Sequence, residues 1–305
     1  MLSEVPSKES ILSAISGIDS ISDPIQGGQK IVYPVVIRGK KYALKVIPLK
    51  NEPVDDGDDS FSISVDDVFL RIKREVETLD ECSVPQLVKL GPIPMSIVEV
   101  DDGPKIIYAE EWVNGRSIRE MIRIQGSISA SEVVRIGIDV TKAVKALWSV
   151  SKVHRDIKPE NIIRRNEGGF VLLDLGFALD LDDISLTGSN LVCGTVPYYS
   201  PEQTDPANKR RLDFRSDLYS LGVVMLEALT GCNPFVSRDG SIASTVRSIQ
   251  TMEIRPTLDT PEIPQSLKAV LLRMMAKEPH LRYRSCDVLL DSLNKVGKSL
   301  AGGLT

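Results

Sequence analysis

The first third of the chain alternates apolar and polar positions in the way that β-strands do. Residues 31–37 and 41–47 are rich in β-branched and aromatic side chains and predict a strand pair. A turn signal at residues 101–104 predicts a second pair, and residues 65–80 have the pattern of a helix. Residues 25–113 are therefore expected to form a small β-rich lobe that carries one main helix.

From residue 114 onward the apolar residues recur at the spacing that is typical of a helix. Within residues 131–150 one face collects five apolar side chains: Val133, Ile136, Val140, Val144 and Leu147. Similar patterns predict helices near residues 217–229, 241–250, 265–276 and 285–296. Residues 114–300 are thus expected to be a helical lobe, followed by a short flexible tail at 301–305. The fold class is α+β, and a cleft that binds a ligand is expected between the lobes.

Two segments lie outside this division. Residues 1–24 are Ser-rich, with Ile11, Ile15 and Ile18 at helical spacing, and predict an amphipathic N-terminal extension. Residues 51–66 form an acidic insertion in the first lobe, and its first nine residues hold five carboxylates. It is either a solvated surface loop or a docking site for a basic partner.

Composition narrows the class of protein. The 305 residues are 42% hydrophobic and 26% charged, which are ordinary globular values. A net charge of -5 argues against a nucleic-acid or membrane partner. The four cysteines include no Cys-x-x-Cys pair, which favours a reducing cytoplasm over a disulfide framework or a zinc site. The apolar stretch at 221–229 is interrupted by Glu227 and is too short to span a membrane.

Chemistry is concentrated in residues 154–161, His-Arg-Asp-Ile-Lys-Pro-Glu-Asn, and in Asp174-Leu175-Gly176. Asp156, Asn161 and Asp174 supply two carboxylates and one amide. Phosphoryl transfer with Mg²⁺ needs one carboxylate for the incoming hydroxyl, together with oxygen ligands for the metal. These residues therefore predict a magnesium-dependent phosphoryl-transfer site.

The octet resembles the catalytic loop of eukaryotic-type (Hanks-type) Ser/Thr protein kinases. The resemblance covers about residues 25–296, and the phrase Gly-Thr-x-x-Tyr-x-Ser-Pro-Glu-Gln at 194–203 looks most like bacterial members. It implies the two-lobed kinase fold, ATP and Mg²⁺. By resemblance, Asp156 accepts the proton of the substrate hydroxyl, Lys158 steadies the γ-phosphate, and Asn161 and Asp174 hold Mg²⁺.

In the first lobe the resemblance implies that Lys45 binds the α- and β-phosphates and pairs with a helix glutamate. Glu77 lies about 200° around the helix from Glu75, so only one of the two can face the cleft. The resemblance to the family's Arg-Glu pattern implies that it is Glu75. The glycine-rich loop departs from the family pattern: Gly27 and Val32 match, while Ile25 and Lys30 replace glycines. Lys30 either adds charge at a phosphate or is an exposed surface lysine.

The resemblance also implies an adenine site. Backbone groups of Glu111 and Val113 would meet the adenine edge, and Ser117 would approach the ribose. The ring would lie among three apolar side chains, Val32, Ala43 and Ile163. Glu110 falls at the gatekeeper position, where a buried carboxylate is costly; either it has a polar partner or the alignment is shifted by one residue.

The segment from Asp174 to Glu202 is similar to an activation segment. Thr195 is expected near the catalytic loop, Glu202 is expected to pair with Arg282, and Asp217 to brace the catalytic-loop backbone. Because Arg155 precedes Asp156, a phosphorylated loop residue is expected to pair with it. The candidate residues are Ser185, Thr187 and Ser189.

Three functions remain open on the sequence alone. A Ser/Thr protein kinase is favoured, acting on protein substrates and self-associating for trans-autophosphorylation. A pseudokinase or nucleotide-binding scaffold is the alternative suggested by the atypical glycine loop and Glu110. A small-molecule kinase is the third, although the Ser200-Pro201-Glu202 segment favours a platform for peptides.

Overall fold

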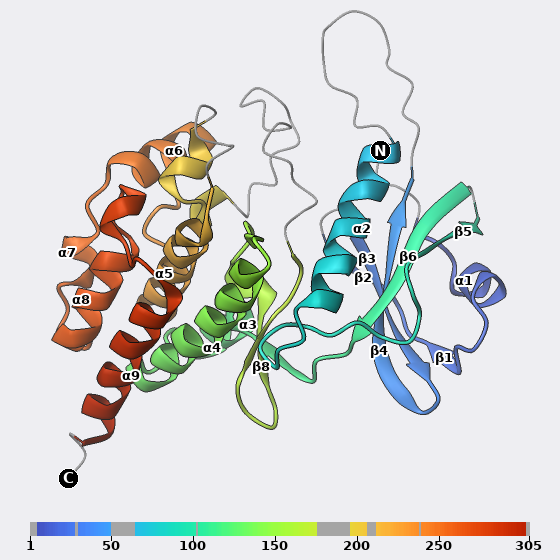
Figure 1. Ribbon diagram of the computed structural model, residues 1–305, viewed down its shortest axis with the longest axis horizontal. Coiled ribbons are helices and arrows are strands. Elements are labelled where there is room, and N and C mark those ends of the chain that lie inside the picture. The colour runs from blue at the N-terminus through green and yellow to red at the C-terminus, as the bar shows by residue number, and fades with distance from the viewer. Residues whose placement is uncertain are drawn as a thin grey trace, which may run out of the picture. The chain divides into compact units, whose positions relative to one another are not determined.

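The computed structural model describes residues 5–27, 30–49, 65–101, 103–175, 196–205, 212–237 and 239–302. The chain divides into two compact units (Figure 1). The N-terminal unit holds Met1–Ser83 and Val88–Val113, and the C-terminal unit holds Val84–Leu87 and Asn114–Thr305. Among the described residues, we find no helix with the length and apolar character that crossing a membrane requires.

The N-terminal unit is built on an antiparallel sheet in the order β1-β3-β4-β6-β5, with β2 also paired to β3. The strand bounds are β1 Ser20–Ile21, β2 Ile25–Gly27, β3 Lys30–Ile37, β4 Lys40–Pro48, β5 Ser96–Val100 and β6 Gly103–Glu111. The predicted strand pair is thus confirmed, extended by one residue at most ends. Arg38 and Gly39 make the tight turn between β3 and β4, both with positive φ.

Each face of this sheet is covered by its own helix. On one face, Ile11 of α1 (Lys8–Ala14) joins Tyr33, Leu44 and Ile107 in a fully buried cluster. On the other face, Ile72 of α2 (Val65–Glu81) packs with Ile47, Ile106 and Tyr108. Because side chains alternate along a strand, β4 sends Leu44 and Val46 to α1, and Lys45 and Ile47 to α2.

The C-terminal unit is helical. α4 (Ala130–Ser149) buries the five apolar residues predicted for its inner face and packs against α5 (Phe214–Thr230) and α9 (Cys286–Gly302) (Figure 1). α5 is buried along nearly its whole length, because helices and loops surround it. The remaining helices are α3 Ile118–Gln125, α6 Ile242–Thr251, α7 Arg255–Leu258 and α8 Gln265–Met274.

A small three-stranded sheet adjoins the catalytic loop, which lies between β7 and β8 in the sequence and leads directly into β8. Its order is β7-β8-β9, with β7 Gly115–Ser117, β8 Ile162–Arg165 and β9 Phe170–Leu172. The β8–β9 hairpin turns through residues 166–169. Residues 154–158 follow α4 and lead into η1 (Pro159–Asn161), so α4 and the small sheet fix both ends of the loop.

Candidate active site

Asp156 is the centre of a polar cluster in the C-terminal unit. Lys158 Nζ lies 2.7 Å from its Oδ2, and Asn161 Nδ2 donates to the same oxygen at 2.9 Å. Asn161 Nδ2 also donates to the Asp156 carbonyl oxygen at 2.9 Å. The other carboxylate oxygen, Oδ1, is buried and accepts no hydrogen bond from any described residue. One oxygen of Asp156 is therefore anchored, and the second is available to a hydroxyl donor.

The electrostatic setting of Asp156 is mixed. Burial raises the pKa of this carboxyl, and the charge of Lys158 and the hydrogen bonds from Lys158 and Asn161 oppose the rise. The negative charge of Asp174 raises the pKa of Asp156 further. A basic carboxylate held by a cation suits a group that must accept a proton and release it again.

The backbone of the catalytic loop is held by Asp217 of α5. Its carboxylate accepts from His154 N at 2.8 Å and from Arg155 N at 2.9 Å. Burial raises the pKa of Asp217 to about 7, against the lowering effect of these two donors. Arg155 has a φ of 69°, a left-handed conformation that costs energy in a non-glycine residue. The brace predicted for Asp217 is confirmed, and it holds a strained turn in place.

Asp174 follows β9 and is tied to the same loop. Leu173 N donates to Asn161 O at 2.8 Å, and a ring nitrogen of His154 lies 3.0 Å from Leu173 O. Asp174 itself has a φ of 50°, which turns the chain sharply after β9. The donor set suits Mg²⁺: Asn161 donates through its amide nitrogen, which leaves the amide oxygen to face a cation, and Asp174 adds a carboxylate.

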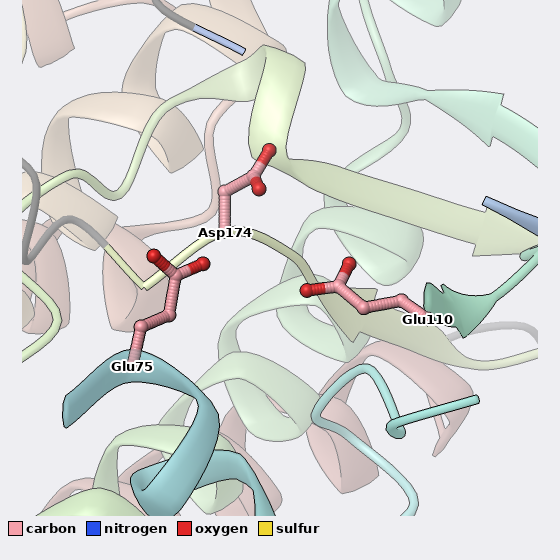
Figure 2. Close-up of side chains that lie close together, drawn as sticks. All are labelled: Glu75, Glu110 and Asp174. Carbon is pink, nitrogen blue, oxygen red and sulfur yellow. The ribbon is translucent and has the colours of Figure 1, made fainter. Parts of the chain in front are cut away.

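The N-terminal unit contains a second polar cluster, beneath α2. Lys45 Nζ lies 3.8 Å from Glu75 Oε1, so the predicted pair is present. Its shorter contact, however, is with Glu110 Oε1 at 2.6 Å. Figure 2 shows Glu110 reaching from β6 toward Glu75 on α2. Of the two explanations offered for Glu110, the structure supports the first, since its polar partner is Lys45.

Lys30 corrects one expectation. Of the two interpretations of Lys30, the exposed surface lysine is wrong, because its side chain is only 14% exposed. Its Nζ lies 2.7 Å and 2.8 Å from the two carboxylate oxygens of Glu75. The Tyr108 hydroxyl donates to Glu75 Oε1 at 2.9 Å. The sequence analysis did not predict that Lys30 and Tyr108 both bind Glu75. The position of Lys30 at the start of β3, and of Tyr108 opposite Lys45, could have indicated these contacts.

The residues expected around adenine fall in both units. In the N-terminal unit, Val32 pairs with Lys45, and Ala43 pairs with Glu110. Gly27 ends β2, and Val113 is buried just after β6. Glu111 donates its N–H to Lys89 O at 2.8 Å, so its N–H is already committed.

The other two adenine-site residues lie in the C-terminal unit. Ser117 pairs with Ile163 across β7 and β8. Ser117 is also the N-cap of α3, where it forms a capping box with Glu120. That reciprocal capping fixes the backbone of Ser117 at the start of the helix.

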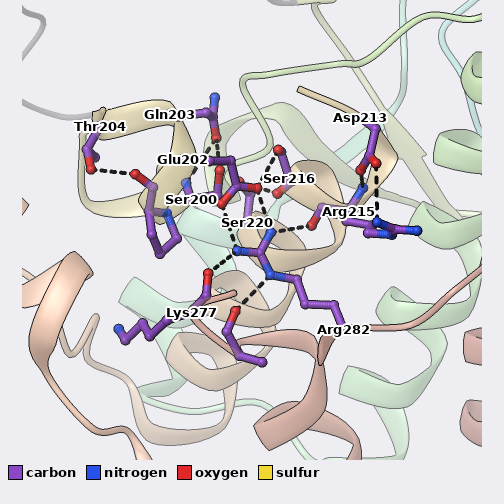
Figure 3. A network of polar contacts seen from close by, with 12 residues as sticks. Ser200, Glu202, Gln203, Thr204, Asp213, Arg215, Ser216, Ser220, Lys277 and Arg282 are labelled. Atoms are coloured by element: carbon purple, nitrogen blue, oxygen red, sulfur yellow. Dashed lines mark hydrogen bonds and ion pairs between the residues drawn. The ribbon is translucent and has the colours of Figure 1, made fainter. Parts of the chain in front are cut away.

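The predicted Glu202–Arg282 ion pair is confirmed and belongs to a larger network (Figure 3). The fully buried guanidinium of Arg282 meets both carboxylate oxygens, at 2.6 Å and 2.7 Å. It also donates to backbone carbonyls of Arg215, Ala276 and Lys277. Burial alone would raise the pKa of Glu202, but Arg282 holds it below its ordinary value.

Two further links were not anticipated from the sequence. Gln203 Nε2 donates to the carbonyl of Arg155 at 3.1 Å, which joins the Ser-Pro-Glu-Gln segment to the catalytic loop. Arg119 bridges Glu160 of that loop and Glu227 of α5, at 2.7 Å and 2.6 Å. Both links need residues far apart in sequence, so no local pattern reveals them. Thr195 and the candidate phosphorylation residues Ser185, Thr187 and Ser189 lie outside the described residues.

Comparisons with known proteins agree with this geometry. Residues 26–293 match the family model of the protein kinase domain. A probable serine/threonine-protein kinase of Clostridium perfringens is 30% identical over 273 residues, which are 90% of this chain and 37% of that protein. Serine/threonine-protein kinase PknB of Mycolicibacterium smegmatis is 30% identical over 76% of this chain and 37% of its own length.

A third relative, serine/threonine-protein kinase PrkC of Bacillus subtilis, is 28% identical over 86% of this chain and 37% of its own length. The chain thus spans little more than a third of the length of these curated relatives. The matched region includes the catalytic loop, Lys45, Glu75 and the Glu202–Arg282 pair. The chain belongs to the protein kinase family.

Proposed function

We propose that the chain is a Ser/Thr protein kinase that transfers the γ-phosphoryl group of ATP to protein hydroxyls. The observation that carries the proposal is the state of Asp156: one oxygen is fixed by Lys158 and Asn161, and the other, buried, has no donor among the described residues. The family match and the relatives, which are named as serine/threonine-protein kinases, support the same reaction.

In the proposed reaction the substrate oxygen forms a bond to the γ-phosphorus, and the bond from that phosphorus to the β,γ-bridging oxygen breaks. Asp156 Oδ1 orients the hydroxyl and takes its proton, while ADP leaves with the bridging oxygen. Lys158 lies beside Asp156 and is placed to neutralise charge on the transferring group. Mg²⁺, when bound by Asn161 and Asp174, would supply neutralisation of the phosphate charge.

We assign the remaining sites by family position. Lys45 and Glu75 serve the phosphates, with Gly27 in the loop before β3. The binding of the nucleoside is assigned to six residues: Val32, Ala43, Glu111, Val113, Ser117 and Ile163. Because the N–H of Glu111 is bonded to Lys89, its carbonyl is the group that we expect a nucleotide to meet. The division into residues 1–24, 25–113, 114–300 and 301–305 is part of this proposal. A cytoplasmic location is also proposed, consistent with the free thiols of Cys232 and Cys286.

Autophosphorylation of the activation segment is a further part of the proposal. No described residue accepts a hydrogen bond from the buried Nε of Arg155. A phosphate on Ser185, Thr187 or Ser189 is the kind of group that such a guanidinium binds. Mass spectrometry of active protein tests this idea, and an unmodified segment in fully active protein would contradict it.

The decisive experiment measures label transfer. Purified protein is incubated with Mg²⁺ and γ-labelled ATP, with and without a generic protein substrate, beside Asp156→Asn. Transfer to protein that falls by at least about 10³-fold in the variant supports a protein kinase, since this change removes the proton acceptor. Nucleotide binding without transfer in the unmodified chain would instead indicate a pseudokinase or scaffold. Transfer to sugars or aminoglycosides alone would indicate a small-molecule kinase.

A further inference from the structure

One arginine joins several segments of the C-terminal unit beside the catalytic loop. Arg119 of α3 has its Nε 2.7 Å from Oε1 of Glu160, which lies in η1. Its Nη1 lies 2.6 Å from Oε1 of Glu227, near the C-terminal end of α5. Its Nη2 donates to the hydroxyl of Tyr198 in η4, which spans Val196–Tyr198. Every nitrogen of the guanidinium is therefore engaged, and two of the acceptors are carboxylates.

This cluster runs from the surface of the unit to its interior. The side chain of Glu160 is 44% exposed and that of Arg119 is 36% exposed, whereas that of Glu227 is only 5% exposed. Burial and the charge of Glu227 raise the pKa of Tyr198, so its hydroxyl stays protonated and donates to Glu227 Oε2 at 2.6 Å. Both oxygens of the buried carboxylate thus have a donor. Arg119 supplies the cation that a carboxylate at this depth requires.

The same cluster lies near the group that is proposed to accept the substrate proton. Glu160 follows Asp156 by four residues, which span at most about 14 Å. Tyr198 precedes Tyr199, whose pKa is raised by burial and by the negative charge of Asp156. Two or three residues of an extended substrate cover about 7–11 Å. We therefore expect an arginine at that distance from the phosphorylated hydroxyl to come within reach of Glu160.

We propose that Arg119 is a specificity-determining residue: it occupies the cation site between Glu160 and Glu227, and so selects against substrates with arginine or lysine within three residues of the hydroxyl. This inference rests on the proposed function, since it names the substrate class of that site. A substrate arginine offers the same fork of N–H donors as Arg119. It would have to displace a guanidinium that belongs to the same chain and therefore competes at a high effective concentration.

Removing Arg119 should create a preference for basic substrates. In Arg119→Ala the buried Glu227 loses its cation, and a substrate arginine can restore the lost contacts. The test compares serine peptides that carry either arginine or citrulline, which has the shape of arginine without its charge, at each position within three residues of the serine. The two peptides of a pair should give kcat/KM values within about twofold on the unmodified chain. Arg119→Ala should favour arginine at least about tenfold at one position or more.

Two further variants assign the effect to this cluster. Arg123→Ala removes an exposed cation from the same helix and should give the same ratio as the unmodified chain. Adding Glu160→Gln to Arg119→Ala removes the exposed carboxylate and should reduce the preference for arginine to below about threefold. A merely structural role of Arg119 predicts an equal loss of kcat/KM for both peptides. That result, the same preference in Arg123→Ala, or a preference for arginine in the unmodified chain would overturn the inference.

A measurement without turnover separates failure of this inference from failure of the proposed function. Ethylguanidinium carries the head group of arginine, whereas ethylammonium is a point cation. At equal ionic strength, ethylguanidinium should raise the thermal midpoint of Arg119→Ala above its value in ethylammonium, and the unmodified chain should show no such difference.

Absent phosphoryl transfer by the unmodified chain would overturn the kinase proposal, while the thermal midpoints would still decide whether Arg119 fills a cation site. Equal midpoints of Arg119→Ala in the two cations would overturn the inference even where transfer is normal. If Arg119→Ala does not fold, Arg119→Gln takes its place, since it keeps part of the side chain and removes the charge.

Discussion

Asp217 shows how a single buried carboxylate holds a strained loop. Its two oxygens each accept one backbone N–H, from His154 and Arg155. In Asp217→Asn only the amide oxygen can accept, so one buried N–H loses its partner. We expect a loss of about 1–3 kcal/mol in the free energy of unfolding, measured by urea titration. The exposed Asp291→Asn should change this free energy by less than about 0.5 kcal/mol.

The Glu202–Arg282 pair predicts a dependence of stability on pH. Arg282 holds the pKa of Glu202 below its ordinary 4.5, despite burial, so the folded chain binds this proton less readily than the unfolded chain does. The stabilisation is therefore fully present above pH 4.5 and is lost as the pH falls through the lowered pKa.

The variant Glu202→Gln tests the direction of this pH dependence. At pH 7 the variant should be about 3–5 kcal/mol less stable, because Arg282 is left buried without its anion. The difference should shrink as the pH falls below 4.5, because the unfolded glutamate then binds its proton first, and it should be smallest below the lowered pKa, where the folded glutamate is also neutral. Denaturant titrations across the acid range measure it, with the exposed Glu253→Gln as the control. A difference that is constant with pH would contradict the ionic origin.

At the scale of elements, local sequence patterns predicted helices and strands well. They predicted few of the contacts between residues that are far apart in the sequence. The apolar period of residues 131–150 gave the buried face of α4, and β-branched runs gave β3 and β4, because these signals repeat within one element. A polar partner for Glu110 was one of two explanations, but its identity as Lys45 and the contact between Lys30 and Glu75 were not foreseen. Both depend on the register of three strands and on which carboxylate reaches which lysine. The links of Arg119 and Gln203 likewise join elements that are distant in sequence.

Gly115 sets the spacing between β7 and β8. A Cβ at this position would lie 1.9 Å from the carbonyl oxygen of Arg164, a backbone atom that cannot move alone. Gly115→Ala should therefore push β7 away from β8 and cost about 1–3 kcal/mol. Gly297→Ala is the control: its Cβ meets only Val134 at 3.5 Å, and alanine favours the helix α9. Urea titration should show a loss for the first variant and no loss for the second.

At the scale of the whole molecule, the residues proposed for the nucleotide and its metal are distributed over both compact units. Lys45 belongs to the N-terminal unit, and Asn161 and Asp174 belong to the C-terminal unit. A ligand that binds the folded chain and not the unfolded chain stabilises it by mass action. The thermal midpoint of the full chain therefore reports nucleotide binding without requiring turnover.

At 100 times its dissociation constant, MgATP should stabilise the chain by about 2.7 kcal/mol and raise the midpoint by several degrees. Removing Mg²⁺ with a chelator should reduce this rise, because the cation that Asn161 and Asp174 would hold would neutralise phosphate charge. Asp174→Asn and Lys45→Met, changed in different units, should each diminish the rise, whereas Asp291→Asn should keep it. A rise that is unaffected by either variant would place the nucleotide elsewhere, since the proposed site assigns both groups to the phosphates and their metal.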